Sequence, residues 1–142
     1  MQDMLLSLII FLPLVGGCLL LFVPRENIQA TRWVALVVAL AGFAVSLPLL
    51  GYDGSTGAMA FQESAAWLPD WGIYWHLGVD GISLWLVLLT TFLGPIVVLG
   101  AWNSVEARHK EFFFHILALQ SFMIGTFCAQ NLAVFYVFWE LM

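Results

Sequence analysis

The stretch Gly81–Trp102 reads GISLWLVLLTTFLGPIVVLGAW and contains no charged side chain. Because an α-helix rises about 1.5 Å per residue, a helix of this length crosses the hydrocarbon core of a bilayer, which is about 30 Å thick. Pro95 lies within the stretch, where a proline is tolerated when neighbouring helices satisfy the carbonyl group that it leaves free. The stretch therefore predicts a membrane-spanning helix.

Three other stretches meet the same requirement, and a fifth begins near the end of the sequence. Met4–Val23, Trp33–Gly51 and Phe112–Ala129 are each long and apolar enough to span. The fifth runs from Asn131 to Met142, about half the length required. Because it stops inside a helix, the chain is expected to be a fragment of a longer protein or to be cut by a premature end. We predict an all-α, polytopic transmembrane helix bundle with four full spans and the start of a fifth.

The composition agrees with this prediction. Of 142 residues, 63% are hydrophobic and 9% are charged, whereas about 25% are charged in a typical soluble domain. A soluble domain of this size cannot bury so much apolar surface, so the excess must face lipid or partner subunits. Four Lys and Arg residues cannot form a patch that follows a phosphate backbone, which excludes nucleic acid as a partner. We expect one transmembrane domain over residues 1–142, surrounded by the lipid bilayer.

The basic residues predict the orientation of the bundle. Arg25 and Arg32 lie between the first two spans, and Arg108 and Lys110 lie between the third and fourth, so all four share one side. The loop Tyr52–Asp80 has acidic residues and no basic ones. By the positive-inside rule this loop faces outward, and so does the N-terminus.

The outer loop contains a pattern typical of a β-strand. From Ile73 to Val79, one face would carry Ile73, Trp75, Leu77 and Val79 and the other Tyr74, His76 and Gly78, which is the period of two that a strand requires. A short strand or hairpin is therefore expected before the third span. Its partner is either another strand of this loop or a strand of a neighbouring subunit.

Glu140 is the one ionisable residue deep inside a predicted span. If the fifth helix starts near Asn131, nine residues at about 1.5 Å each place Glu140 about 13 to 14 Å into the membrane, close to its midplane. An acid there costs a few kcal/mol at least, so it faces protein or water. Two interpretations are a proton relay and a protonated side chain that only links helices. We favour the relay, because Ser, Thr, Asn or Gln links helices at lower cost.

Two further residues are minor candidates. Asp80 precedes the third span, with Ser83 three positions later, and either caps that helix or belongs to an outer proton exit. His115 follows Glu111 by four residues and either pairs with it on one helix face or belongs to an inner proton entry. His76 has no other candidate ligand nearby, so no metal site is expected.

The chain resembles the antiporter-like M subunits of bacterial respiratory complex I, the counterparts of mitochondrial subunit 4, over nearly its whole length. The segments that carry the resemblance are Pro13–Gly17 (PLVGG), Arg32–Leu36 (RWVAL), His76–Leu84 (HLGVDGISL), Leu89–Leu93 (LTTFL) and Phe135–Glu140 (FYVFWE). The most specific parts are DGISL and FWE. The chain would then be the N-terminal part of a subunit with about fourteen helices in two inverted repeats.

The resemblance implies a function and its location. Glu140 would be the fifth-helix glutamate of a proton channel, acting against lysines on later helices that lie outside this sequence. The subunit would translocate protons in an NADH:quinone oxidoreductase without a redox centre of its own. NADH, FMN, iron–sulfur clusters and quinone would bind elsewhere in the complex, and other membrane-arm subunits would be its partners. The bacterial inner membrane is expected, with the N-terminus on the periplasmic side; the alternative is the mitochondrial inner membrane.

Two alternative functions remain open from the sequence. Mrp-type sodium/proton antiporter subunits share the fold and the glutamate, although the Asp80–Ser83 segment fits subunit M better. The other alternative is a membrane structural or assembly protein in which Glu140 has no transport role.

Overall fold

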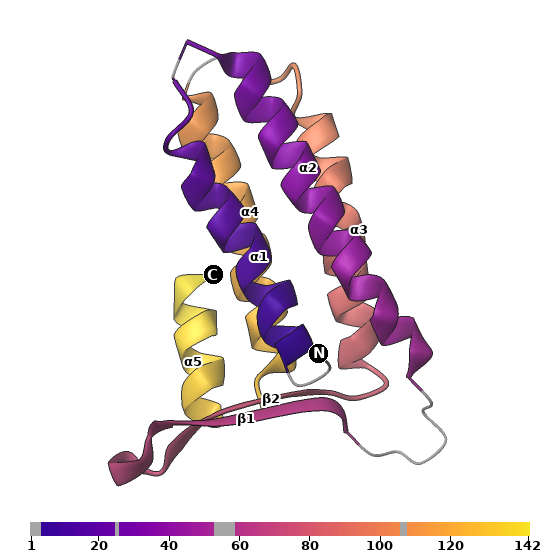
Figure 1. Ribbon diagram of the computed structural model, residues 1–142, viewed down its shortest axis with the longest axis vertical. Helices are drawn as coiled ribbons and strands as arrows, with labels where there is room; N and C mark the ends of the chain where they lie inside the picture. Colours follow the sequence, from indigo (N-terminus) through magenta and orange to yellow (C-terminus); the bar gives the residue numbers. More distant parts are fainter. Residues whose placement is uncertain (1–3, 25, 53–58, 106–107) are drawn as a thin grey trace.

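The computed structural model describes residues 4–24, 26–52, 59–105 and 108–142. Four long helices and a shorter fifth stand side by side, and a β-hairpin lies across one end of the bundle (Figure 1). The helices are α1 Leu5–Leu20, α2 Ile28–Ser46, α3 Ser83–Gly100, α4 His109–Cys128 and α5 Leu132–Leu141, and the strands are β1 Ala60–Leu68 and β2 Ile73–Val79. The fold is the predicted helical membrane bundle.

Each of the four predicted spans, and the predicted start of a fifth, corresponds to a helix. Within the described ranges, three helices are long and apolar enough to cross a membrane: α2 together with the 3₁₀ turn that continues it to Gly51, α3, and α4. The first helix has 16 residues, but turn hydrogen bonds extend its winding to the N–H of Val23, which donates to Leu20 at 3.1 Å. The fifth helix begins directly after Asn131, as predicted.

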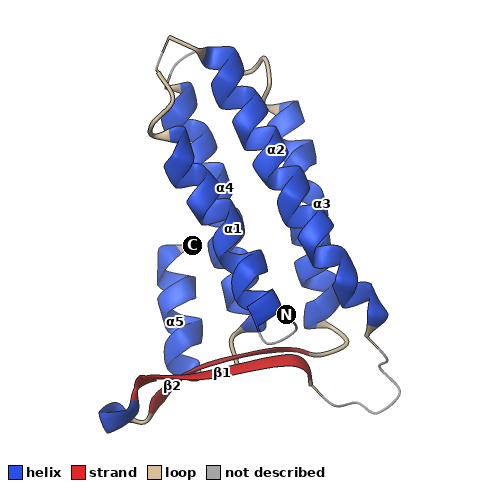
Figure 2. Ribbon diagram, in the orientation of Figure 1, coloured by secondary structure: helices blue, strands red, loops and turns tan. Residues whose placement is uncertain are grey.

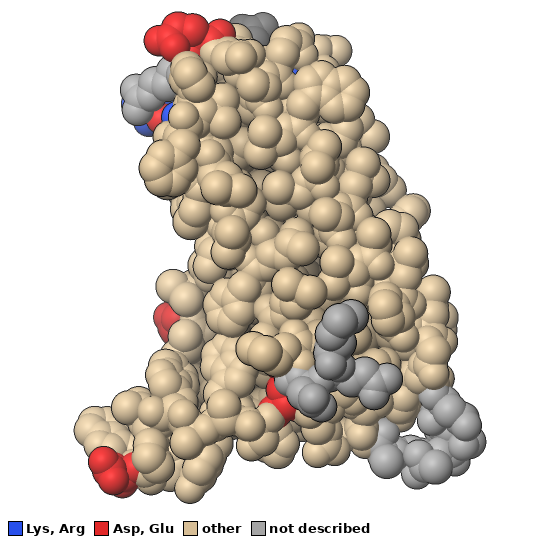
Figure 3. Space-filling model, in the orientation of Figure 1, with Lys and Arg blue, Asp and Glu red and all other residues tan. Residues whose placement is uncertain are grey.

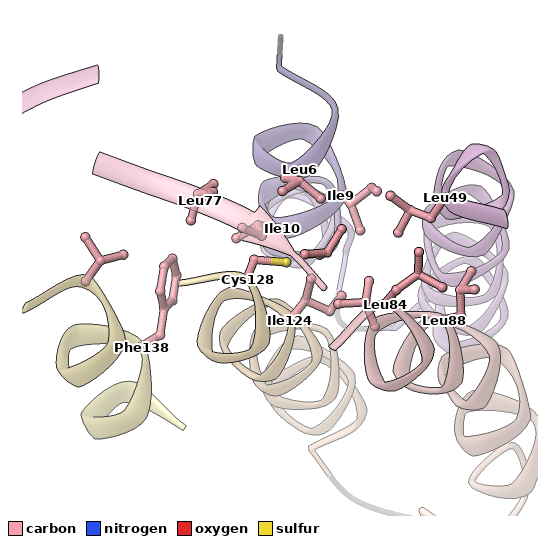
Figure 4. Close-up of a cluster of buried hydrophobic side chains, with 13 residues drawn as sticks. Leu6, Ile9, Ile10, Leu49, Leu77, Leu84, Leu88, Ile124, Cys128 and Phe138 are labelled. Carbon is pink, nitrogen blue, oxygen red and sulfur yellow. The ribbon is translucent and has the colours of Figure 1, made fainter. Parts of the chain in front are cut away.

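The four long helices enclose a common core. Helix α1 packs against α2 and α4, and α3 completes the ring by packing against α2 and α4. At the hairpin end, side chains from every helix and from β2 converge, including Ile10, Leu77, Ile124, Cys128 and Phe138 (Figure 4). Outside this core the surface is almost entirely uncharged along the length of the helices (Figure 3), as expected of a chain that faces lipid and other subunits.

The basic side chains that the structure describes lie at one end of the bundle, opposite the hairpin. The Lys110 ammonium group donates to the carbonyl oxygens of Leu21 at 2.9 Å and Val23 at 2.6 Å, at the end of α1. The Arg32 guanidinium lies 5.9 Å from the ring centroid of Trp102, at the end of α3. Arg25, which also supported the predicted orientation, lies outside the described residues. The two loops that were predicted to share a side therefore do so.

The hairpin confirms the predicted strand and identifies its partner. Strand β2 has the predicted bounds, Ile73–Val79, and pairs antiparallel with β1 of the same loop (Figure 2). Ala65 pairs with Trp75 in this register, and Gly72 makes the turn with a φ of 68°, a left-handed conformation that favours glycine. Strand β1 was not predicted, because its sequence AFQESAAWL lacks a regular alternation.

Candidate functional site

Glu140 lies on the side of α5 that faces away from the rest of the chain. The buried residues of α5 are Val134 and Phe138, and they pack against α4 and β2. Glu140 follows Phe138 by two residues and Val134 by six, which places it about 200° and 240° around the helix from them. Its side chain is exposed, and no hydrogen bond or ion pair joins it to any residue in the described ranges. The carboxylate is therefore open to groups outside this chain.

Two local features fix where Glu140 lies along α5 and which way its side chain faces. The Asn131 side chain accepts a hydrogen bond from the N–H of Ala133 at 2.8 Å, which caps the start of α5 and confirms the residue from which the depth of Glu140 was counted. The Phe138 ring fills the space beside Gly125 on α4, where a Cβ atom would lie 2.5 Å from the ring. Because Phe138 holds one side of α5 against α4, Glu140 must face the other way.

Asp80 forms a reciprocal cap at the start of α3. Its Oδ1 atom accepts hydrogen bonds from the N–H of Ile82 at 2.9 Å and of Ser83 at 2.7 Å, and its own N–H donates to the Ser83 hydroxyl at 2.9 Å. The backbone N–H of Ser83 is the largest influence that lowers the pKa of the Asp80 carboxyl below its ordinary value. This geometry supports the capping interpretation.

His115 is exposed on α4, one and a half turns from its start, where its Nδ1 atom lies 2.5 Å from the backbone carbonyl oxygen of Glu111. This contact is with the Glu111 backbone, so the side-chain pair that their spacing suggested stays a prediction. Asp80, His115 and Glu140 occupy three separate places in the fold and form no cluster. Among the described residues, no three His, Cys, Asp or Glu side chains gather in a way that could hold a metal ion.

The most buried acid that the structure describes was not predicted from the sequence. Glu63 on β1 is 6% exposed, and its Oε1 atom accepts from the N–H of Leu6 at 2.6 Å. It also accepts from the N–H and the hydroxyl of Ser7, so it caps the start of α1 from a distant strand. The only available signal was its presence among several loop acids, which does not single it out.

The apolar helices, with a β-hairpin across one end, define a polytopic membrane protein of the helical-bundle class. The family described as NADH-ubiquinone oxidoreductase chain 4, amino terminus, matches residues 4–126. The chain belongs to this family, which confirms the resemblance seen in the sequence.

Individual relatives agree with the family match. The chain is 42% identical over 136 residues to NADH-ubiquinone oxidoreductase chain 4 of Arabidopsis thaliana, covering 95% of this chain and 28% of the relative. It is 45% identical over 145 aligned residues to NADH-quinone oxidoreductase subunit M of Rhodobacter capsulatus, covering 99% of this chain and 28% of the relative. It is 42% identical over 139 residues to NAD(P)H-quinone oxidoreductase chain 4 of Prochlorococcus marinus (strain MIT 9303), covering 96% of this chain and 24% of the relative. The chain thus spans about a quarter of the length of these relatives.

Proposed function

We propose that this chain is the N-terminal part of a proton-translocating membrane-arm subunit of an NADH:quinone oxidoreductase, and that Glu140 relays the proton. The observation that carries the proposal is the direction of Glu140. A carboxylate at about the middle of the membrane, on the unpacked side of α5, is open to a partner group that none of the described residues supplies.

The chemistry of the relay depends on what approaches Glu140. A charged carboxylate at this depth is costly unless water or a basic group faces it. When a basic group moves close, the carboxylate is stabilised and releases its proton; when that group withdraws, Glu140 takes up a proton again. Quinone reduction elsewhere in the complex would drive this alternation through a series of charged groups in the membrane arm. In this proposal His115 and Asp80 would have minor roles at the inner and outer ends.

Partners and location follow from the same proposal. Other membrane-arm subunits and lipid would cover the exposed apolar surface, including Trp71 at the tip of the hairpin, which is 81% exposed. The bacterial inner membrane is favoured by the bacterial relatives, with the hairpin and N-terminus on the periplasmic side. The mitochondrial inner membrane is the alternative. NADH, FMN, iron–sulfur clusters and quinone would bind to other subunits, since the work assigned to this chain is proton transfer and not electron transfer.

Replacement of Glu140 by glutamine in the full-length, assembled subunit tests the relay. Glutamine keeps the size and hydrogen-bonding capacity of the side chain but has no proton to transfer. Proton pumping should fall sharply, and quinone reduction should fall with it where coupling is tight. Glu26→Gln is a matched control, because Glu26 is an exposed loop acid and the same change there should leave pumping intact.

The same experiment separates the relay from a purely structural role. Assembly must be measured in each preparation, because an unassembled complex would also fail to pump. A fully assembled Glu140→Gln complex that pumps at the wild-type proton-to-electron ratio would contradict the relay and favour a structural or assembly role.

The matching family is named for an NADH-ubiquinone oxidoreductase, which favours the complex I assignment over an Mrp-type antiporter.

A further inference from the structure

An apolar groove runs along the outside of the bundle between α3 and α4. Its volume is about 290 Å³, and its lining residues extend from Leu86 to Val97 on α3 and from Ile116 to Phe127 on α4. Each of these stretches covers about three turns, or roughly 16 Å along the helix. The groove therefore has the elongated form of a surface against which another helix packs.

Gln120 is a polar residue in the lining of this groove. It is 5% exposed, and neither its Nε2 nor its Oε1 atom has a hydrogen-bond partner among the described residues. Gln120 lies eleven residues after His109, about 16 to 17 Å along a helix that is about 30 Å long, so it sits near the middle of the membrane. A buried amide without a partner is costly, which indicates that a partner comes from outside the described chain.

Gly94 on α3 provides the space in which the amide rests. A Cβ atom at position 94 would lie 2.7 Å from both Nε2 and Oε1 of Gln120. Thr90, one turn away on α3, also lines the groove, but its hydroxyl donates to the carbonyl oxygen of Leu86 at 2.7 Å. Nothing on α3 therefore satisfies the amide. To meet a partner in the groove, the flexible Gln120 side chain would rotate so that its amide turns from Gly94 toward the open side.

The depth of Gln120 decides what kind of group can meet it. Lipid acyl chains have no hydrogen-bonding atoms, and the polar headgroups lie about 15 Å from the midplane. A polar side chain of another transmembrane helix reaches this depth, and such interhelical hydrogen bonds are common in membrane proteins. The relatives continue for about three quarters of their length beyond the matched part, so the full-length subunit supplies further chain for this purpose.

We infer that the α3–α4 groove binds a transmembrane helix from a later part of the full-length subunit, which presents a hydrogen-bonding side chain near its middle to Gln120. The bound helix covers the apolar lining, and its polar side chain pairs with the amide. This inference rests on the family assignment and is independent of the relay role of Glu140.

Photo-crosslinking in native membranes tests which molecule fills the groove. A photoreactive amino acid is placed in the full-length subunit at Leu119, which lines the groove and is 39% exposed. Mass spectrometry should identify a crosslink to a later segment of the same subunit that has a polar residue at mid-span. Crosslinks only to lipid, or only to a different subunit, would overturn the inference.

Replacement of Gln120 by methionine tests the role of the amide in the same photoreactive background. Methionine keeps the length and flexibility of the side chain but removes its strong hydrogen-bonding groups. Crosslinking should fall by about three- to tenfold, the effect of losing one interhelical hydrogen bond in a membrane. Met123→Leu, which changes the apolar lining without removing such a bond, should leave it unchanged. An equal yield from Gln120→Met and wild type would show that the amide has no partner. Proton pumping is measured separately, so loss of the crosslink and loss of the relay are distinguishable.

Discussion

Glu63 and Ser7 are 56 residues apart, yet the Glu63 carboxylate accepts hydrogen bonds from both the N–H of Ser7, at 3.2 Å, and the Ser7 hydroxyl. Within the part of the chain that the structure describes, the N-cap residue of helix α1, Met4, makes no side-chain hydrogen bond to the start of the helix. A carboxylate at this position satisfies free N–H groups and interacts favourably with the helix dipole. The hairpin is thereby joined to the first helix.

This link predicts a loss of stability when Glu63 is removed. Glu63→Ala should lower the free energy of unfolding by about 1–3 kcal/mol, because the N–H groups of Leu6 and Ser7 lose a charged acceptor. Thermal unfolding in a membrane mimetic measures the change, and hydrogen exchange at the start of α1 locates it. Glu63→Gln retains an acceptor oxygen and should lose less. Unchanged exchange at Leu6 and Ser7 in Glu63→Ala would show that the carboxylate does not cap α1.

The cap at Asp80 predicts a dependence of stability on pH. Because hydrogen bonds from Ser83 and Ile82 lower the pKa of Asp80 in the folded chain, the charged form contributes stability. This contribution is present at pH values above the ordinary pKa of 3.8 and is lost as the pH falls through the lower folded-state pKa.

Unfolding of wild type and Asp80→Ala should therefore be compared between neutral and strongly acidic pH. Near neutral pH the variant should be less stable by about 0.5–2 kcal/mol, the usual effect of losing a cap. The difference should shrink in acid, where the wild-type carboxyl is protonated. Asp80→Asn keeps an acceptor oxygen and should lose less at neutral pH. A difference that stays constant with pH would show that the charge of Asp80 does not contribute.

The contact between Gly125 and Phe138 predicts that a single methyl group disturbs the last helix. In Gly125→Ala the new Cβ atom would overlap the Phe138 ring, so α5 must shift away from α4 at a cost of about 1–3 kcal/mol. Gly100→Ala is the matched control, because Gly100 is also in a helix but has no neighbouring atom within 4 Å of the added Cβ. Thermal unfolding of both variants tests the contact. Equal stability of the two would mean that α5 does not depend on it.

The separation of the hairpin and the basic loops predicts which residues are reached from each side of the membrane. Ser64 on β1 and Ser104 after α3 are both exposed and lie at opposite ends of the bundle. With the two native cysteines replaced, a membrane-impermeant thiol reagent should label Ser64→Cys from outside intact cells. It should label Ser104→Cys only after the membrane is opened. The reverse pattern would invert the orientation.

Properties that depend on neighbouring residues along the chain could be predicted from the sequence. The helices, the bounds of β2, the cap between Asp80 and Ser83 and the start of α5 at Asn131 follow from apolar run length, periodicity and short-range hydrogen bonding. The position of Glu140 along its helix is of this kind, because it is obtained by counting residues.

Contacts between distant parts of the chain were decided only by the tertiary structure. Strand β1 is a strand because β2 pairs with it, and Glu63 is buried because that pairing brings it to the start of α1. Gln120 lies against Gly94 because α3 and α4 pack side by side. The direction of the Glu140 side chain depends on the packing of the Phe138 ring beside Gly125. Each of these contacts joins residues whose separation in sequence leaves no local pattern, so the free energy of packing, and not the intrinsic preference of a segment, determines it.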